Sequence, residues 1–269
     1  MTTTALTPIP PNTMLYSIVL PAHNEERNVL PAITSLASAL RRESIPFEIV
    51  VVNDNSTDQT PDVVTDAMAD YPEVVLVHNT RPGGLGRALR FGLQHVHGDA
   101  IAIVMADLSD SPDDVVRCYR KLEEGYDCVF GSRFIRGSKV THYPLYKLLA
   151  NRMVNRMMQV LFLTRHNDLT NAFKAYRRHV IEAISPLRAA HFNITIEMSL
   201  SALIRRYRIA QIPISWSGRT WGISNLKLRQ HGRRYLCTML KVWFERLLIL
   251  DDIMAENPPA VPGEPPRDR

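Results

Sequence analysis

The chain has 269 residues, of which 45% are hydrophobic and 22% charged, a balance typical of a globular protein with a sizeable core. This composition excludes wholesale disorder and collagen-like structure. The formal net charge of +5 is unevenly distributed: residues 1–127 carry 9 Lys and Arg against 18 Asp and Glu, whereas residues 128–250 carry 21 against 4. A basic second half is either a solvated face or a surface that attracts nucleic acid, anionic lipid or phosphorylated substrates.

Short apolar runs alternate with helical patterns through the first half of the chain. The expected strands are Tyr16–Leu20, Phe47–Val52, Val74–Val77, Ile101–Met105 and Cys128–Phe130, and the expected helices run from Val29 to Leu40, from about Pro61, from about Leu85 and over Asp113–Leu122. This alternation predicts an α/β fold with a mostly parallel central sheet and helices on both faces. Ligands bind such sheets beyond the carboxyl ends of the strands, where the polar clusters of this chain fall.

The second half reads as two long amphipathic helices, over Pro144–Leu163 and Arg234–Leu250, which mix apolar with basic residues. Such helices either pack on the sheet or lie in a membrane interface, and the pattern alone leaves both interpretations open. Residues 1–13 are rich in Thr and Pro and residues 255–269 are rich in Pro. Both ends are therefore expected to be flexible.

Three features bear on localisation. Cys118, Cys128 and Cys237 form neither a disulfide framework nor a zinc motif, which favours a reducing cytosol. No apolar run approaches the roughly 18–20 residues of a membrane-spanning helix. The N-terminal stretch MTTTALTPIPPN has no basic start and no apolar core, so no signal peptide is expected.

Several motifs at the expected strand ends occur in a specific order along the chain. They are SIVLPAHNEERNV, IVVVNDNSTDQT, NTRPGGLGRAL, MADLSDSPDDV, DCVFGSRFIRGS, NDLTNAFKAYRR, NITIEMSLSA and PISWSGRTWGISNLKL. In this order the chain resembles family 2 glycosyltransferases of the GT-A fold, and within them the dolichol-phosphate mannosyltransferase-like enzymes. The resemblance implies a Rossmann-like catalytic domain over 14–230, with a nucleotide-sugar half (14–127) and a basic acceptor half (128–230), followed by an amphipathic C-terminal helix (231–254).

The resemblance implies a nucleotide-sugar site at the strand ends. Glu25 suits the ribose hydroxyls because a carboxylate accepts hydrogen bonds from them. Ser56 and Asp58 are instead expected to serve the turn before the helix near Pro61. The residues assigned to the nucleotide sugar are Pro21, Ala22, Asn24, Glu25, Asp54, Gly84, Ala106, Arg219 and Lys227.

The metal motif departs from the family pattern of Asp-x-Asp. Met105 stands where the family has its first Asp, and a thioether is a poor ligand for Mg²⁺. Asp107 keeps the second position and is expected to be the main ligand of Mg²⁺ or Mn²⁺, assisted by Ser109 or Asp110.

The acceptor phosphate is assigned by resemblance to Arg133, Arg136 and Ser224. Asp107, Arg133 and Arg219 are the expected catalytic residues, with Arg219 neutralising charge on the leaving diphosphate. Asp168 and Glu197 are isolated acids in a basic sequence, and each either contacts a ligand or pairs with a basic residue.

The expected function is an inverting transfer of a hexose from a nucleotide sugar, GDP-mannose first and UDP-glucose second, to a polyprenyl phosphate. The alternatives are another acceptor and, because of Met105 and Asn53, a non-catalytic nucleotide-sugar binder. Nucleic-acid binding is not expected, since no motif supports it. We expect a cytoplasmic protein that is peripheral at the cytoplasmic face of the membrane, through its basic helices or a membrane-protein partner.

Overall fold

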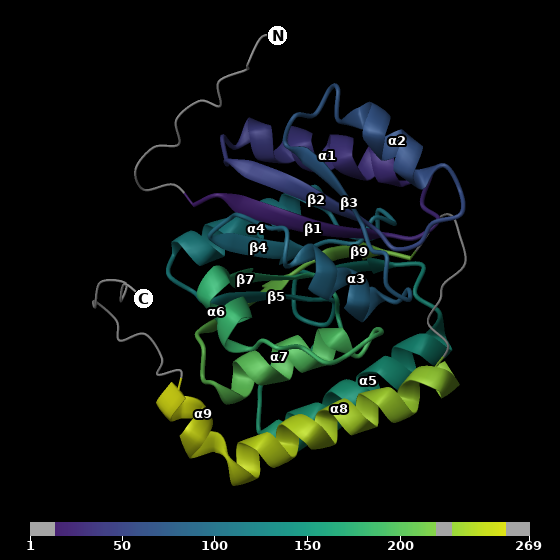
Figure 1. The fold of residues 1–269 in the computed structure, drawn as a ribbon. Coiled ribbons are helices and arrows are strands. Elements are labelled where there is room, and N and C mark those ends of the chain that lie inside the picture. Colours follow the sequence, from purple (N-terminus) through teal and green to yellow (C-terminus); the bar gives the residue numbers. More distant parts are fainter. Residues whose placement is uncertain (1–13, 219–227, 257–269) are drawn as a thin grey trace.

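A seven-stranded sheet organises the computed structural model, which describes residues 14–218 and 228–256 (Figure 1). The strand order is β3-β2-β1-β4-β7-β5-β8, and only β7 runs antiparallel to its two neighbours. The strands are β1 (Tyr16–Ala22), β2 (Phe47–Asn53), β3 (Val74–His78), β4 (Ala100–Ile103), β5 (Cys128–Ser132), β7 (Lys174–Arg177) and β8 (Ile209–Pro213). The mostly parallel α/β sheet is therefore confirmed.

The central strands are largely apolar because helices cover both faces of the sheet. In β1, every residue is buried, and its register with β2 runs from the pair Tyr16–Phe47 to the pair Ala22–Asn53. One face packs on α1 (Val29–Arg42), α2 (Thr60–Ala67) and α4 (Pro112–Glu123). The other packs on α3 (Leu85–Gly92), α6 (Arg178–Ala183) and α7 (Ile194–Ile204).

Two long helices form an outer layer beyond α7 (Figure 1). They are α5 (Leu145–Phe162) and α8 (Leu228–Leu248), and the short α9 (Leu250–Glu256) follows α8. Both long helices were expected, although the chain divides into α8 and α9 near Ile249 rather than forming one helix over 231–254. Among the described residues, no helix combines the length and the low polarity needed to cross a bilayer.

A small second sheet links the acceptor half to the metal motif. It pairs β6 (Lys139–Thr141) with β9 (Ser215–Ser217) in parallel. Asp110 forms an isolated antiparallel bridge with Trp216, and the Ser217 amide donates to the Ser109 carbonyl at 3.1 Å. The segment after β8 is thereby fixed against the loop after β4.

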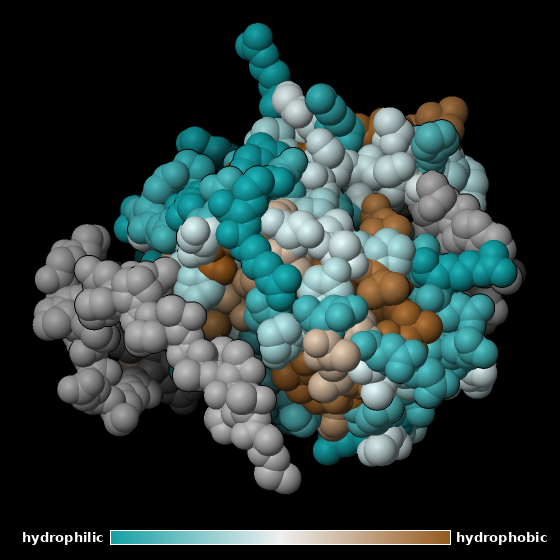
Figure 2. All heavy atoms as spheres, turned by 90° about the horizontal axis from the view of Figure 1, so that it is seen from above, coloured by the Kyte–Doolittle hydropathy of each residue, from teal (hydrophilic) through white to brown (hydrophobic). Residues whose placement is uncertain are grey.

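The surface over α1 and α2 differs from the outer layer of α5 and α8. Seen from that side, hydrophilic and neutral residues prevail, and hydrophobic residues form separate small patches (Figure 2). Large exposed apolar side chains are concentrated instead on α5 and α8.

Candidate active site

The carboxyl ends of β2, β1, β4 and β5 lie at one edge of the sheet because these four strands run in the same direction. The loops that follow them carry most of the residues predicted for the site. Asp54 follows β2, Asn24 and Glu25 follow β1, Asp107 follows β4 and Arg133 follows β5. The Asp54 amide donates to the Ala22 carbonyl at 2.8 Å, which joins the first two loops at their base.

Asp54 and Gly84 were predicted to bind the nucleotide, and the structure brings them together. The buried Asp54 carboxylate accepts hydrogen bonds from Asn79 Nδ2 and from the Gly84 amide, both at 2.7 Å. Gly84 begins α3 with a φ of +140°, and a Cβ there would lie 2.6 Å from the Ala190 carbonyl oxygen. Only glycine fits this position, which brings a backbone amide to a carboxylate at the start of a helix.

The loop after β1 is tied to the loop after β2. Asn24 Oδ1 accepts from the Thr57 amide at 2.8 Å, and the Glu25 amide donates to Thr60 Oγ1 at 2.9 Å. The buried Glu25 carboxylate accepts from Asn28 Nδ2 at 2.6 Å. Pro21 and Ala22 are buried within β1, so they shape the base of this site.

Asp58 occupies the turn position expected for it. Its Oδ1 accepts from the Thr60 amide at 3.0 Å, directly before α2, and its Oδ2 accepts from the Glu26 amide at 3.2 Å. Ser56 Oγ accepts from the Asn24 amide at 3.1 Å. Both side chains therefore hold the two loops in place.

The metal motif forms a tight loop after β4. Asp107 Oδ1 accepts from the Ser109 amide at 3.1 Å, and Asp110 Oδ2 accepts from the Met105 amide at 3.3 Å. Leu108 between them adopts a left-handed φ of +59°, which is rare outside glycine. Burial, and then the charge of Asp107, raise the pKa of Asp110 to about 7. The two carboxylates are thus close enough to interact.

These residues fit a divalent cation in part. Carboxylate and hydroxyl oxygens suit Mg²⁺ and Mn²⁺, and such ions often take one or two protein carboxylates together with substrate phosphates. Within 14–218 and 228–256, no three His, Cys, Asp or Glu side chains gather as a metal-binding group. Ala106, which precedes Asp107 in the chain, is buried.

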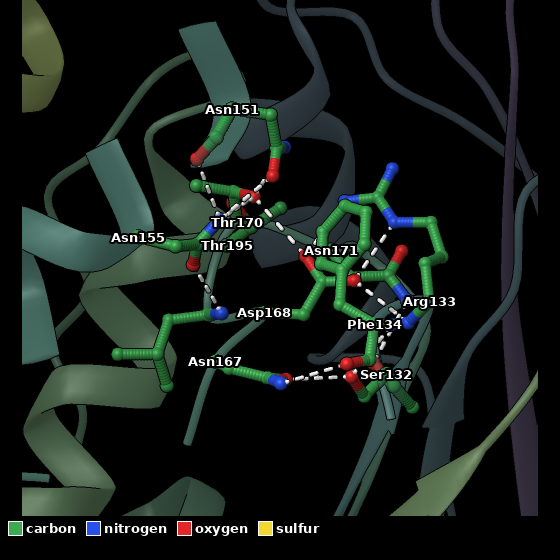
Figure 3. Close-up of polar contacts among 12 residues, drawn as sticks. Ser132, Arg133, Phe134, Asn151, Asn155, Asn167, Asp168, Thr170, Asn171 and Thr195 are labelled. Atoms are coloured by element: carbon green, nitrogen blue, oxygen red, sulfur yellow. Dashed lines mark hydrogen bonds and ion pairs between the residues drawn. The ribbon is translucent and has the colours of Figure 1, made fainter. Parts of the chain in front are cut away.

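Arg133 forms a buried ion pair with Asp168 (Figure 3). Its Nε and Nη2 donate to the two carboxylate oxygens at 2.8 and 2.7 Å, and its amide donates to the same carboxylate at 3.0 Å. The side chains are only 8% and 0% exposed. Although burial disfavours the charged guanidinium, Asp168 raises the pKa of Arg133 above its ordinary value. Asp168 was expected either to contact a ligand or to pair with a basic residue, and the structure shows the pair with a basic residue.

Aromatic rings surround the Arg133 guanidinium. The ring centroids of Phe134, Tyr143 and Trp216 lie 5.4, 5.4 and 5.5 Å from its central carbon. Since Trp216 also bridges to Asp110, the rings connect the guanidinium to the metal motif. Arg136 is exposed in the following loop. Arg219, Ser224 and Lys227 lie outside the described residues.

Lys174 is a buried residue of the site region that the sequence patterns did not reveal. Its Nζ donates to the carbonyl oxygens of Leu169, at 3.0 Å, and of Asn171. Burial lowers the pKa of Lys174 to about 7. Lys174 thus fixes the turn that carries Asp168.

Glu197 also has structural partners. Its carboxylate accepts from the Arg188 and Ala189 amides, at 3.0 and 2.7 Å, and from Lys241 Nζ at 3.0 Å. It therefore joins α7 to α8 and to the segment before α7, in which the Ala190 carbonyl lies against Gly84.

The family of the chain is shown by its sequence rather than by the geometry of the site. The model of the family described as Glycosyl transferase family 2 matches residues 17–185, well over half of the chain. The chain belongs to glycosyl transferase family 2. The resemblance predicted from its motifs is confirmed.

Three curated relatives share its sequence. A dolichol-phosphate mannosyltransferase of Pyrococcus furiosus is 28% identical, over 80% of this chain and 60% of that protein. A polyprenol monophosphomannose synthase of Mycolicibacterium smegmatis is 28% identical, over 78% of this chain and 80% of that protein. An undecaprenyl-phosphate 4-deoxy-4-formamido-L-arabinose transferase of Yersinia enterocolitica is 34% identical, over 62% of this chain and 50% of that protein. The chain thus spans 60% and 50% of the length of two of them.

Solved structures share the fold. A glucosyl-3-phosphoglycerate synthase of Mycobacterium tuberculosis in complex with UDP superposes with a TM-score of 0.64 at 22% identity, over 86% of this chain and 80% of that chain. A structure described as that of a mycobacterial protein superposes with a TM-score of 0.66 at 21% identity, over 85% of this chain and 74% of that chain. At this level of identity the likeness concerns the fold, and it confirms the expected GT-A-like arrangement.

Proposed function

We propose that this family 2 member transfers a hexose from a nucleotide sugar to a polyprenyl phosphate with inversion at the anomeric carbon. GDP-mannose is the donor that we put first, because two of the relatives are named for mannosyl transfer to dolichol or polyprenol phosphate. UDP-glucose is the second donor to be tried. The relative named for undecaprenyl phosphate supports a lipid phosphate as the acceptor.

The observation that carries the proposal concerns the carboxylates at the strand-end edge. Asp54, Glu25 and Asp168 each hold polar partners within the protein. Asp107 and Asp110 belong to the metal motif. A sugar hydroxyl as acceptor would need a general base, whereas a polyprenyl phosphate is already an anionic nucleophile at neutral pH. The arrangement therefore favours a phosphate acceptor.

Residues in different strand-end loops are assigned to the nucleotide, to the metal ion and to the acceptor phosphate. Asp54 and the glycines before α3 lie where the nucleotide binds in folds of this kind, beyond the carboxyl ends of β2 and β3. Asp107, with Ser109 or Asp110, would hold Mg²⁺ or Mn²⁺, which supplies positive charge for the departing diphosphate. Arg133, which is paired with Asp168 and surrounded by aromatic rings next to this motif, is the guanidinium that we assign to the acceptor phosphate.

The residues outside the described ranges keep the roles that the resemblance implies. Arg219 and Lys227 are assigned to the donor and Ser224, with Arg136, to the acceptor phosphate. We also place the protein in the cytoplasm, peripheral at the cytoplasmic face of the membrane, because a polyprenyl phosphate resides in the bilayer. Nucleic acid is not among the proposed partners.

The test is transfer of radiolabelled sugar from a panel of nucleotide sugars to undecaprenyl phosphate, counted in the butanol phase with Mg²⁺ present. A butanol-extractable product from GDP-mannose is the expected result, and a product from UDP-glucose alone would change the donor. Nucleotide binding without product from any donor would instead support a binder whose metal motif has decayed at Met105. In that case Met105→Asp should create turnover.

A further inference from the structure

The asparagine side chains of helix α5 face the protein interior, and many of its apolar side chains face outward. Asn155, only 1% exposed, accepts from the Leu169 amide at 2.7 Å through Oδ1 and donates to Thr170 Oγ1 at 3.0 Å through Nδ2 (Figure 3). On the outer side, Met153 and Val160 are 70% and 69% exposed. Because the amide side is bonded to the turn that carries Asp168, the helix cannot rotate to bury its apolar side.

Helix α8 lies beside α5 and shows the same outward apolar pattern (Figure 1). Its inner side packs through Met239 and Val242, which are buried in the core shared with α7. We call the outward side chains of the two helices the α5–α8 face. Its apolar members are Leu145, Leu149, Met153, Met157 and Val160 of α5 and Leu236, Leu240, Phe244, Leu247 and Leu248 of α8.

Basic side chains accompany these apolar ones. Arg152 and Arg156 are exposed on α5, and Arg233 is exposed on α8. The sequence has no acid between Asp127 and Asp168, so α5 is free of acidic residues. A helix with an apolar side and basic flanks suits the headgroup region of an anionic bilayer. A second copy of this chain fits less well, because a symmetric contact would place the same basic groups opposite one another.

The position of α5 connects this face to the acceptor site. The helix begins at Leu145, two residues after Tyr143, whose ring lies 5.4 Å from the Arg133 guanidinium. We infer that the α5–α8 face docks on the surface of an anionic lipid bilayer, with the N-terminus of α5 bringing the phosphate site to the headgroups. This inference rests on the proposed function for the identity of the acceptor, and it names the surface by which the enzyme reaches it.

The experiment is sedimentation of the full chain with vesicles of phosphatidylcholine that contain phosphatidylglycerol, at low ionic strength. The test variant is Leu149→Glu with Val160→Glu. The control variant is Leu30→Glu with Met68→Glu, which adds the same charge at exposed apolar positions of α1 and just after α2. We expect vesicle affinity to fall at least about tenfold in the test variant and to stay near the wild type in the control, since apolar insertion supplies much of the binding. Circular dichroism checks that both variants fold.

Three results would overturn the inference. The first is a wild type that fails to sediment with these vesicles, and the second is a test variant that sediments equally well. The third is a wild-type dimer that becomes a monomer in the test variant while vesicle binding is unchanged, which would assign the face to a second copy. Transfer to a water-soluble short-chain polyprenyl phosphate separates this inference from the proposed function. Vesicle binding without transfer to any acceptor would contradict the function and leave the face intact.

Discussion

Arg133 and Asp168 form a bidentate ion pair whose side chains are almost completely buried. The pair joins the end of β5 to the turn before β7, and the Arg133 amide donates to the same carboxylate. A guanidinium held in this way is fixed in position without a ligand. The ion pair therefore orders this side chain before any ligand binds.

Asp168→Asn should strongly destabilise the protein, since it leaves the Arg133 charge buried without its counter-ion. We expect the free energy of unfolding to fall by about 3–5 kcal/mol, measured by urea denaturation. The control is Asp113→Asn, which breaks the exposed ion pair with Arg42 and should cost less than about 1 kcal/mol. Equal losses of unfolding free energy in the two variants would show that the buried ion pair contributes no more to stability than the exposed one.

Asp54→Asn should weaken nucleotide binding, because Asn79 Nδ2 and the Gly84 amide donate to different carboxylate oxygens and asparagine replaces one of these oxygens with an NH2 donor. We expect at least about a tenfold loss of affinity for GDP by calorimetry, from the loss of a charge-assisted acceptor and of the ordered start of α3. Asp58→Asn, in the adjoining turn, should lower stability and leave GDP affinity nearly unchanged. A larger loss of affinity in Asp58→Asn would place the nucleotide elsewhere.

Lys174 should make stability depend on pH in a specific direction. Burial lowers its pKa to about 7 in the folded protein, below the ordinary value of 10.5. Above pH 7 the unfolded chain therefore binds more protons than the folded one, and the free energy of unfolding gains up to about 1.4 kcal/mol per pH unit from this residue. The stability of the wild type relative to Lys174→Met should thus grow from pH 7 to pH 9.

The comparison needs an exposed lysine as its control. Lys121 forms an exposed ion pair with Glu124, and the hydrogen bond to that glutamate raises its pKa. Lys121→Met should therefore show no growing difference from the wild type over the same pH range. A constant or shrinking difference for Lys174→Met would mean that its ammonium stays charged in the core.

Removing the cation should stop turnover, and EDTA provides that test. Asp107→Ala should weaken Mn²⁺ binding in the presence of GDP at least about tenfold, since few protein ligands support the ion. Met105→Asp should tighten it by adding a carboxylate on the other side of Ala106. Electron paramagnetic resonance of Mn²⁺ measures both changes without relying on activity. Unchanged Mn²⁺ affinity in Asp107→Ala would remove this loop from the metal site.

The part of the site formed by the loops after the parallel strands could be predicted, because it depends on apolar runs and the polar residues after them in the sequence. The runs that became β1, β2 and β4 are largely apolar on both faces; polar residues follow β1 and β2 directly, and Asp107 follows β4 after three apolar residues. Neighbouring parallel strands then bring Asp54 and Gly84 to one edge, as observed. The resemblance supplied the family, which no periodicity in the chain reveals.

Other features depend on tertiary pairing and escaped the sequence patterns. Helix α7 is buried on nearly all sides, so it has no polar face to mark a helical period. Strand β7 begins with Lys174, a charged residue whose carbonyl partners come from the turn before it. The partner of Arg133 is 35 residues away and follows from the β5–β7 pairing. Isolated acids in a basic sequence are the signal that pointed toward Asp168.

The most direct test of the central claim compares acceptors that differ only in their phosphate. Purified protein receives GDP-mannose, Mg²⁺ and either undecaprenyl phosphate or undecaprenol at neutral pH, and the product is analysed by NMR at the anomeric carbon. We predict a β-linked mannosyl phosphate from the phosphate acceptor and no product from the alcohol. Comparable transfer to undecaprenol, or an α-linked product, would contradict inverting transfer to a lipid phosphate.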